Sequence, residues 1–146
     1  MLRSIKNYFF STFREIFVYH HSSLEFRAKT YAVLIGSANE PISQYESTLQ
    51  EIASAIYSEP DRAEALVLTV HEYIKKMRAK KQTGEEALLM EVIRELRLVP
   101  RYALKIEPEH LERLAQCTKA HDSQIYHQRL IDFLKQKRLE YRELKR

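Results

Sequence analysis

The sequence predicts an all-α fold, a single-domain bundle of about seven helices. Only 2 of its 146 residues are Gly and only 4 are Pro, whereas a sheet protein needs these residues for its many tight turns. Apolar residues recur at helical spacing along most of the chain, and no stretch alternates apolar and polar residues as a half-buried strand does. A chain of this length can bury a full hydrophobic core. We therefore expect one helical domain.

Residues 1–21 are predicted to form an amphipathic N-terminal helix with an aromatic face. Its apolar stripe follows the helical period and consists of Leu2, Ile5, Phe9, Phe13, Ile16 and Phe17, with Phe10 beside it. The interpretation that we favour is that this helix packs on the bundle as ordinary core. The alternative is that its face binds a membrane surface or a partner, while nearby cations meet anionic headgroups. The residues of that alternative are Phe9, Phe10, Phe13 and Phe17, with Arg3, Lys6 and Arg14.

Residues 22–146 are predicted to hold the remaining six helices, and local signals mark where these begin or end. Three helices begin at capping boxes, in which Ser or Thr is followed three residues later by Glu. The boxes are Ser22 with Glu25, Ser43 with Glu46, and Thr83 with Glu86. The stretch 58–61 separates the third helix from the fourth, Pro100 ends the fifth, and the sixth follows Pro108. Asp122 or Ser123 is the expected N-cap of the last helix.

Apolar stripes at helical spacing predict the residues that form the core. In the second helix the stripe is Leu24, Ala28, Tyr31, Ala32 and Ile35. In the fourth helix it is Ala63, Leu66, Val67, Val70, Ile74 and Met77. The fourth helix then runs into several Lys and Arg residues, which the helix dipole favours at a C-terminus.

Residues 38–46 read Ala-Asn-Glu-Pro-Ile-Ser-Gln-Tyr-Glu, which resembles the A-D-G-x-I-S-x-x-E turn of TerB-like domains, the helical family named for tellurite resistance. The likeness spans roughly residues 24–135, and residues 86–114 resemble a weaker second copy. The resemblance implies a TerB-like bundle of two loosely related helical halves over residues 22–146. Such a domain also occurs in membrane-anchored J-domain co-chaperones, so the resemblance further implies stress- or chaperone-linked work.

The resemblance also raises the question of a metal site, because family members that bind divalent metal are expected to use acidic residues of these turns. In this chain Asn39 and Glu40 stand at the Asp and Gly positions. Hard cations need several oxygen ligands, and only Glu40 and Glu46 remain as candidates here. Glu46 is also explained as the capping-box partner of Ser43, which is the interpretation that we favour. We predict no metal and no other cofactor.

Catalytic motifs are missing from the sequence pattern. The six histidines lack the spacings of metal ligands, so we expect them at the surface or at helix edges. No nucleophile with a poised base can be assembled from neighbouring residues, and two glycines cannot build a phosphate-binding loop. We therefore predict that the protein is not an enzyme and that it has no catalytic residue.

The net charge of +4 is carried by residues 133–146, at the end of the last helix. The basic residues of this stretch are Lys135, Lys137, Arg138, Arg142, Lys145 and Arg146, whereas the rest of the chain is balanced. The simplest interpretation is a solvated helix end. The alternatives are a surface for nucleic-acid phosphates, against which Glu140 and Glu143 interrupt the run, and a surface for an acidic protein partner.

The predicted function is a non-catalytic adaptor or regulatory module that binds a protein partner. The alternative is a membrane-surface or nucleic-acid-associated protein that uses its basic termini, and self-association is a further option. The single Cys117 excludes an internal disulfide and is typical of a reducing compartment. Charged residues interrupt the N-terminal apolar stretch, which is untypical of a signal peptide. We expect a cytoplasmic protein, with peripheral contact to the inner face of a membrane as the alternative.

Overall fold

The structure, a computed structural model, describes residues 22–143 of the chain. The predicted helix at 1–21, with its four phenylalanines, and the cations Lys145 and Arg146 lie outside the described residues. Within them the chain forms α-helices and two short 3₁₀ helices and no strand, which confirms the all-α prediction. The elements in order are α2 (Ser22–Ser37), η1 (Ile42–Tyr45), α3 (Glu46–Ile56), α4 (Pro60–Ala79), α5 (Gln82–Leu98), η2 (Pro100–Lys105), α6 (Pro108–Ala115) and α7 (His121–Glu143).

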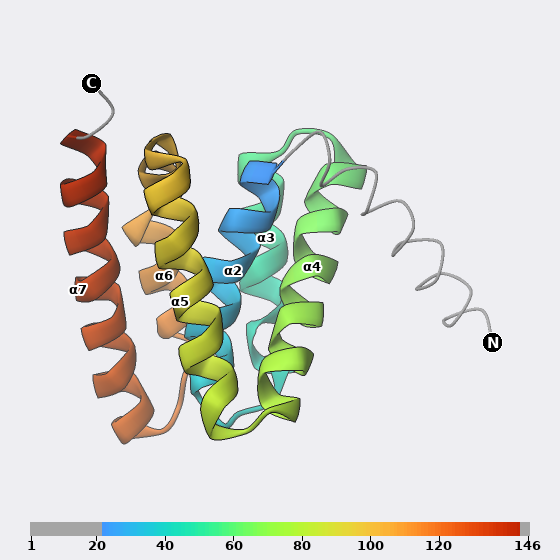
Figure 1. Ribbon diagram of the computed structural model, residues 1–146. Coiled ribbons are helices and arrows are strands. Elements are labelled where there is room, and N and C mark those ends of the chain that lie inside the picture. Colours follow the sequence, from blue (N-terminus) through green and yellow to red (C-terminus); the bar gives the residue numbers. More distant parts are fainter. Residues whose placement is uncertain (1–21, 144–146) are drawn as a thin grey trace.

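Helix α2 lies in the middle of the bundle, and the other α-helices surround it (Figure 1). Every side chain from Leu24 to Ile35 is buried except those of Glu25 and Lys29, which are half-buried. Buried side chains thus lie on every face of α2, as in a helix inside a protein rather than at its surface. The predicted stripe of α2 is therefore buried, but the burial extends well beyond one stripe.

The remaining helices complete the core around α2. Helix α4 packs against both α2 and α3, whereas α7 packs against α6 and η2 and forms one side of the bundle (Figure 1). All six residues of the predicted α4 stripe are buried. The second half contributes a smaller set of fully buried apolar side chains, namely Val92, Leu96, Ala103, Ile106, Leu111, Leu114, Ile131 and Leu134.

The capping box predicted at Ser43 is wrong. Ser43 lies inside η1 and is exposed, and α3 begins only at Glu46, after the N-cap residue Tyr45. No side chain caps α3 at Tyr45. The Glu46 carboxylate instead contacts His71 of α4, with 2.6 Å between Oε2 and Nε2. A 3₁₀ turn ahead of the helix displaces the serine from the position that capping requires.

Two other predicted helix starts are also shifted. Helix α5 begins at Gln82, so Thr83 lies inside it and donates its hydroxyl hydrogen to the carbonyl of Lys80 at 3.1 Å. Helix α7 begins at His121, which places Asp122 and Ser123 in its first turn rather than at its N-cap. The backbone N–H groups of Lys119 and Ala120, which immediately precede α7, find a partner that is distant in the sequence, as described below.

A tight turn joins α4 to α5 and depends on Gly84. A Cβ atom placed on Gly84 would lie 2.0 Å from the carbonyl oxygen of Met77, so no larger residue fits without a backbone shift. Lys81, which precedes α5, has a φ of 55°, a value that side chains with a Cβ adopt only at a cost. This turn brings the two helices into close contact at one end of the bundle.

Candidate functional site

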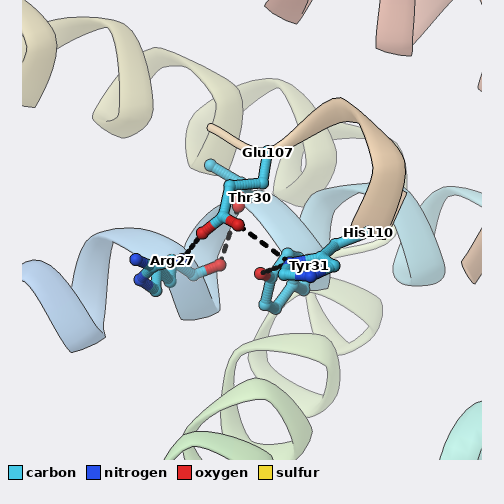
Figure 2. A network of polar contacts seen from close by, with 5 residues as sticks. All are labelled: Arg27, Thr30, Tyr31, Glu107 and His110. Carbon is cyan, nitrogen blue, oxygen red and sulfur yellow. Dashed lines mark hydrogen bonds and ion pairs between the residues drawn. The ribbon is translucent and has the colours of Figure 1, made fainter. Parts of the chain in front are cut away.

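A network of polar side chains joins α2 to the start of α6. Figure 2 shows Arg27, Thr30 and Tyr31 on α2, facing Glu107 and His110 at the N-terminal end of α6. Arg27 donates a hydrogen bond to the Glu107 carboxylate and forms an ion pair with it. The other Glu107 oxygen lies 3.5 Å from His110 Nδ1, which is itself 3.3 Å from the Tyr31 hydroxyl. Thr30 donates to the Arg27 carbonyl at 2.7 Å.

This network is enclosed and holds two halves of the chain together. Arg27 is only 8% exposed, and a buried guanidinium without a carboxylate would be costly. Burial is the main reason why the pKa of Tyr31 is raised well above its usual value, so the phenol stays protonated. The apolar stripe of α2 did not predict that Arg27 is buried. A cation is expected to be exposed to solvent unless a carboxylate partner is known, and Glu107 is distant in the sequence.

A second network joins the turn after α2 to the start of α7. The Glu40 carboxylate accepts hydrogen bonds from the backbone N–H groups of Lys119 at 2.9 Å and Ala120 at 3.3 Å, and from the Gln44 side chain at 2.6 Å. These contacts, with that of Gln44 first, lower the pKa of Glu40. The N-terminus of a helix favours a nearby negative charge. Glu40 places one at the start of α7 by binding the two residues that precede the helix.

Behind Glu40 lies a buried chain of hydrogen bonds. The Tyr45 hydroxyl lies 2.7 Å from Thr118 Oγ1, which lies 3.2 Å from Nδ1 of His127. Thr118 and His127 are both buried, so the expectation that the histidines lie at the surface or at helix edges is wrong for His127. Burial lowers the pKa of His127, while the backbone of Leu34 and the charge of Glu40 act in the opposite direction.

Arg78 of α4 fixes the turn that resembles the TerB-like sequence. Its guanidinium donates hydrogen bonds to the carbonyls of Ala38 at 2.8 Å and Glu40 at 2.7 Å. We predicted cations at the end of α4 as partners of that helix's own dipole. Arg78 does lie in the last turn of α4, and its guanidinium in addition satisfies carbonyl groups that follow α2.

Glu40 and Glu46, the two residues considered for a metal, face different partners. Glu40 contacts the start of α7, whereas Glu46 contacts His71 and also accepts a hydrogen bond from Gln50 at 3.2 Å. In residues 22–143 no three His, Cys, Asp or Glu side chains are grouped as a metal ion would require. The described contacts of both carboxylates are with hydrogen-bond donors of the protein itself.

An open pocket of about 520 Å³ lies between α6 and α7. Ala115 and the buried Ile131 supply its apolar lining, and the rest of its lining is polar. The polar residues are Glu112, Gln116, Gln124 and Gln128. Glu112 is paired with Lys135 at 3.2 Å, which leaves a lining of carboxamides and one neutralised carboxylate. The sequence pattern did not indicate this pocket, because its two walls come from different helices.

The predicted basic surface of α7 is divided in the structure. Lys135 pairs with Glu112, and Lys137 pairs with Glu140 at 3.3 Å. Arg138 is half-buried, and Arg142 is exposed. The two lysines are thus partly neutralised, and of the two arginines only Arg142 is fully exposed.

Comparison of the chain with protein-family models, with curated proteins and with solved structures found no match. The TerB-like resemblance therefore stays a prediction from residues 38–46. Among the described residues, no helix has both the length and the apolar character needed to cross a membrane.

Proposed function

We propose that the protein is a non-catalytic adaptor or regulatory module that binds a segment of a protein partner in the α6–α7 pocket. The pocket is the observation that carries this proposal. Its volume of about 520 Å³ lies in the range of specific binding sites. Carboxamide side chains both donate and accept hydrogen bonds, which suits them to peptide groups.

The lining of the pocket defines the kind of segment that it would accept. An apolar side chain of the partner would reach Ala115 and Ile131, while its backbone would meet the carboxamides of Gln116 and Gln128. Because Lys135 neutralises Glu112, the pocket has little charge of its own. Contacts of this type are screened little by salt, so binding should persist at high ionic strength.

Both walls of the pocket are held in place before any partner binds. The Arg27–Glu107 pair fixes the start of α6, and Glu40 fixes the start of α7. A site on elements that are already ordered loses less conformational entropy on binding. The TerB-like resemblance supports a stress- or chaperone-linked partner.

Site-specific photo-crosslinking in cells tests the proposal. A photoreactive residue is placed at Gln128 in the pocket and, as a control, at Ser54, which is exposed on α3. We expect one protein to crosslink at Gln128 and not at Ser54. That protein is then purified, and its affinity for the unmodified chain is measured by calorimetry at low and high salt.

A matched pair of variants links that affinity to the pocket. Gln116→Ala with Gln128→Ala removes two pocket carboxamides, whereas Gln50→Ala with Gln136→Ala removes two exposed ones elsewhere. Each lost hydrogen bond weakens binding severalfold, so the pocket pair should lower the affinity by about tenfold and the control pair should leave it unchanged. Equal effects of both pairs, or the same crosslinked proteins at both sites, would show that the pocket is not the binding site.

A further inference from the structure

One end of the bundle carries cations and exposed leucines from three elements. They are Arg97 and Leu98 of α5, Arg101, Leu104 and Lys105 of η2, and Arg138, Leu139 and Arg142 of α7. Lys105 and Arg138 are half-buried, and the other six side chains are exposed. We call this group the basic end. Helix η2 packs on α7, and α5 and α7 finish at the same end of the bundle (Figure 1). Residues separated by more than 30 positions in the sequence are thus brought to one end.

The cations of the basic end are not neutralised by the described part of the chain. None of its five Arg and Lys residues forms an ion pair with a carboxylate in residues 22–143. The nearby carboxylates of Glu95, Glu107 and Glu140 are paired with Lys29, Arg27 and Lys137 instead. Of the carboxylates on the last turn of α7, only Glu143 is left without a described ion pair. A surface with this excess of positive charge attracts an anionic partner.

The leucines give the basic end a second property. Leu98 is 71% exposed, Leu139 51% and Leu104 37%, and they make up half of the six large apolar side chains that are exposed in residues 22–143. Single exposed leucines are common on protein surfaces, whereas a group of them is typical of an interaction site. Leucines set among cations are the pattern of proteins that lie at a lipid–water boundary.

The described part of the chain begins at this same end. Phe26, near the start of α2, packs on Tyr102 of η2 with 5.2 Å between the ring centroids. The first described residue, Ser22, therefore lies at the end of the bundle that η2 occupies (Figure 1). The sequence of residues 1–21 combines aromatic residues with cations, which is the composition expected of a segment at a membrane interface.

We propose that the basic end docks on an anionic lipid surface. The five cations contact the charged headgroups, and the three leucines enter the boundary between headgroups and acyl chains. A nucleic acid fits less well, because its phosphates would use the arginines but leave the leucines exposed to water. Single-stranded nucleic acid would also need exposed rings for stacking, and Tyr102, the aromatic residue of η2, is buried.

Docking at the basic end leaves the α6–α7 pocket open. The pocket is lined by Gln124, Gln128 and Ile131 in the first half of α7, whereas the basic end uses Arg138, Leu139 and Arg142 near its other end. Ile131 and Arg138 lie seven positions apart in this helix, about 10 Å along its axis at 1.5 Å per residue. The lipid-docking surface is thus separate from the pocket, and each can be tested without the other.

Co-sedimentation of the full chain with vesicles tests the proposal. One set of vesicles contains phosphatidylcholine alone and the other also contains phosphatidylglycerol, and each is measured at low and high salt. Three triple variants are compared with the unmodified chain. They are Arg97→Gln/Arg101→Gln/Arg142→Gln, Leu98→Ser/Leu104→Ser/Leu139→Ser and, as the control, Lys75→Gln/Lys80→Gln/Lys81→Gln at the opposite end of the bundle. All nine side chains are exposed, and circular dichroism checks that each variant is folded.

We expect the unmodified chain to bind phosphatidylglycerol vesicles and to bind them less at high salt. Removing three arginines should lower the vesicle partition coefficient by about a hundredfold. The leucine triple variant should also lose most of its binding, and the lysine triple variant should retain it. Loss of vesicle binding in both the arginine and the leucine variants would identify the partner as a lipid surface rather than an acidic protein or a nucleic acid.

Three results would overturn the proposal. The first is a loss of vesicle binding in the lysine control that equals the loss in the arginine variant, which would show that binding depends only on the net charge of the protein. The second is full binding by either the arginine or the leucine variant. The third is tight binding to an oligonucleotide or to an acidic protein that needs the arginines but not the leucines, together with no vesicle binding.

Discussion

Arg27 of α2 and Glu107, which precedes α6, form an ion pair across the middle of the fold although 80 residues separate them in the sequence. Their side chains are 10% and 29% exposed, so neither charge has full access to water. Lys29 of the same helix makes a parallel connection to Glu95 of α5 at 2.7 Å. The central helix thus carries two cations, each of which binds a carboxylate from the second half of the chain.

Loss of the Arg27 guanidinium should destabilise the protein. Arg27→Met leaves the Glu107 carboxylate partly buried without its cation, and we expect the free energy of unfolding to fall by about 2 kcal/mol. Arg113→Met is the control, because its pair with Glu51 is 44% and 65% exposed and should contribute less than about 1 kcal/mol. Urea unfolding measures both. Equal losses in the two variants would show that the enclosed position of Arg27 adds nothing.

Local sequence patterns predicted the helices well and their partners poorly. Spacing of apolar residues depends only on the helical repeat, so the stripes of α2 and α4 are buried as expected. A single apolar stripe is typical of a helix whose opposite face is exposed to solvent. The stripe therefore did not indicate that α2 is enclosed on all sides, with Phe26 and Leu34 buried as well.

The candidate sites were harder to predict because their parts meet only in the folded chain. Glu40 and the backbone of Lys119 lie 79 residues apart, and no local rule connects them. Ser43 and Glu46 have the spacing of a capping box, yet η1 occupies that position. The basic residues of α7 were visible in the sequence, whereas Arg97 and Arg101 join them only because η2 packs on α7.

The two glycines should respond differently to the same substitution. In Gly84→Ala the new Cβ would lie 2.0 Å from the Met77 carbonyl oxygen, which only a shift of the backbone relieves. We expect a loss of about 2 kcal/mol, typical of overpacking. In Gly36→Ala the contact is with the flexible end of the Met77 side chain at 2.8 Å, and the better helix propensity of Ala offsets its movement. Thermal unfolding should show a clear loss for Gly84→Ala alone, and similar melting temperatures would contradict the close approach.

Glu40 should contribute to stability only while it is ionised. Its hydrogen bonds with Gln44 and the backbone of Lys119 lower its pKa in the folded protein below the ordinary value of 4.5. Its stabilising effect is therefore complete above that value and is lost as the pH falls through the folded pKa. Glu40→Gln should lower the melting temperature at neutral pH. As the pH is lowered, the melting temperature of this variant should decrease less than that of the unmodified chain. Glu86→Gln, at an exposed position on α5, is the control, and an equal change in its pH profile would refute the assignment to Glu40.

The buried imidazole of His127 should add a second pH dependence at a higher pH. Burial holds the pKa of His127 below the ordinary value of 6.5 in the folded protein, so the unfolded chain takes up a proton first as the pH falls. Stability is then complete above 6.5 and is lost as the pH falls through the folded pKa. His127→Asn, whose amide can still reach Thr118, should show a smaller fall in melting temperature between about pH 7.5 and about pH 5.5. His121→Asn, at an exposed position in the first turn of α7, should keep the profile of the unmodified chain. If His127→Asn keeps it too, the loss of stability between these pH values arises from another group.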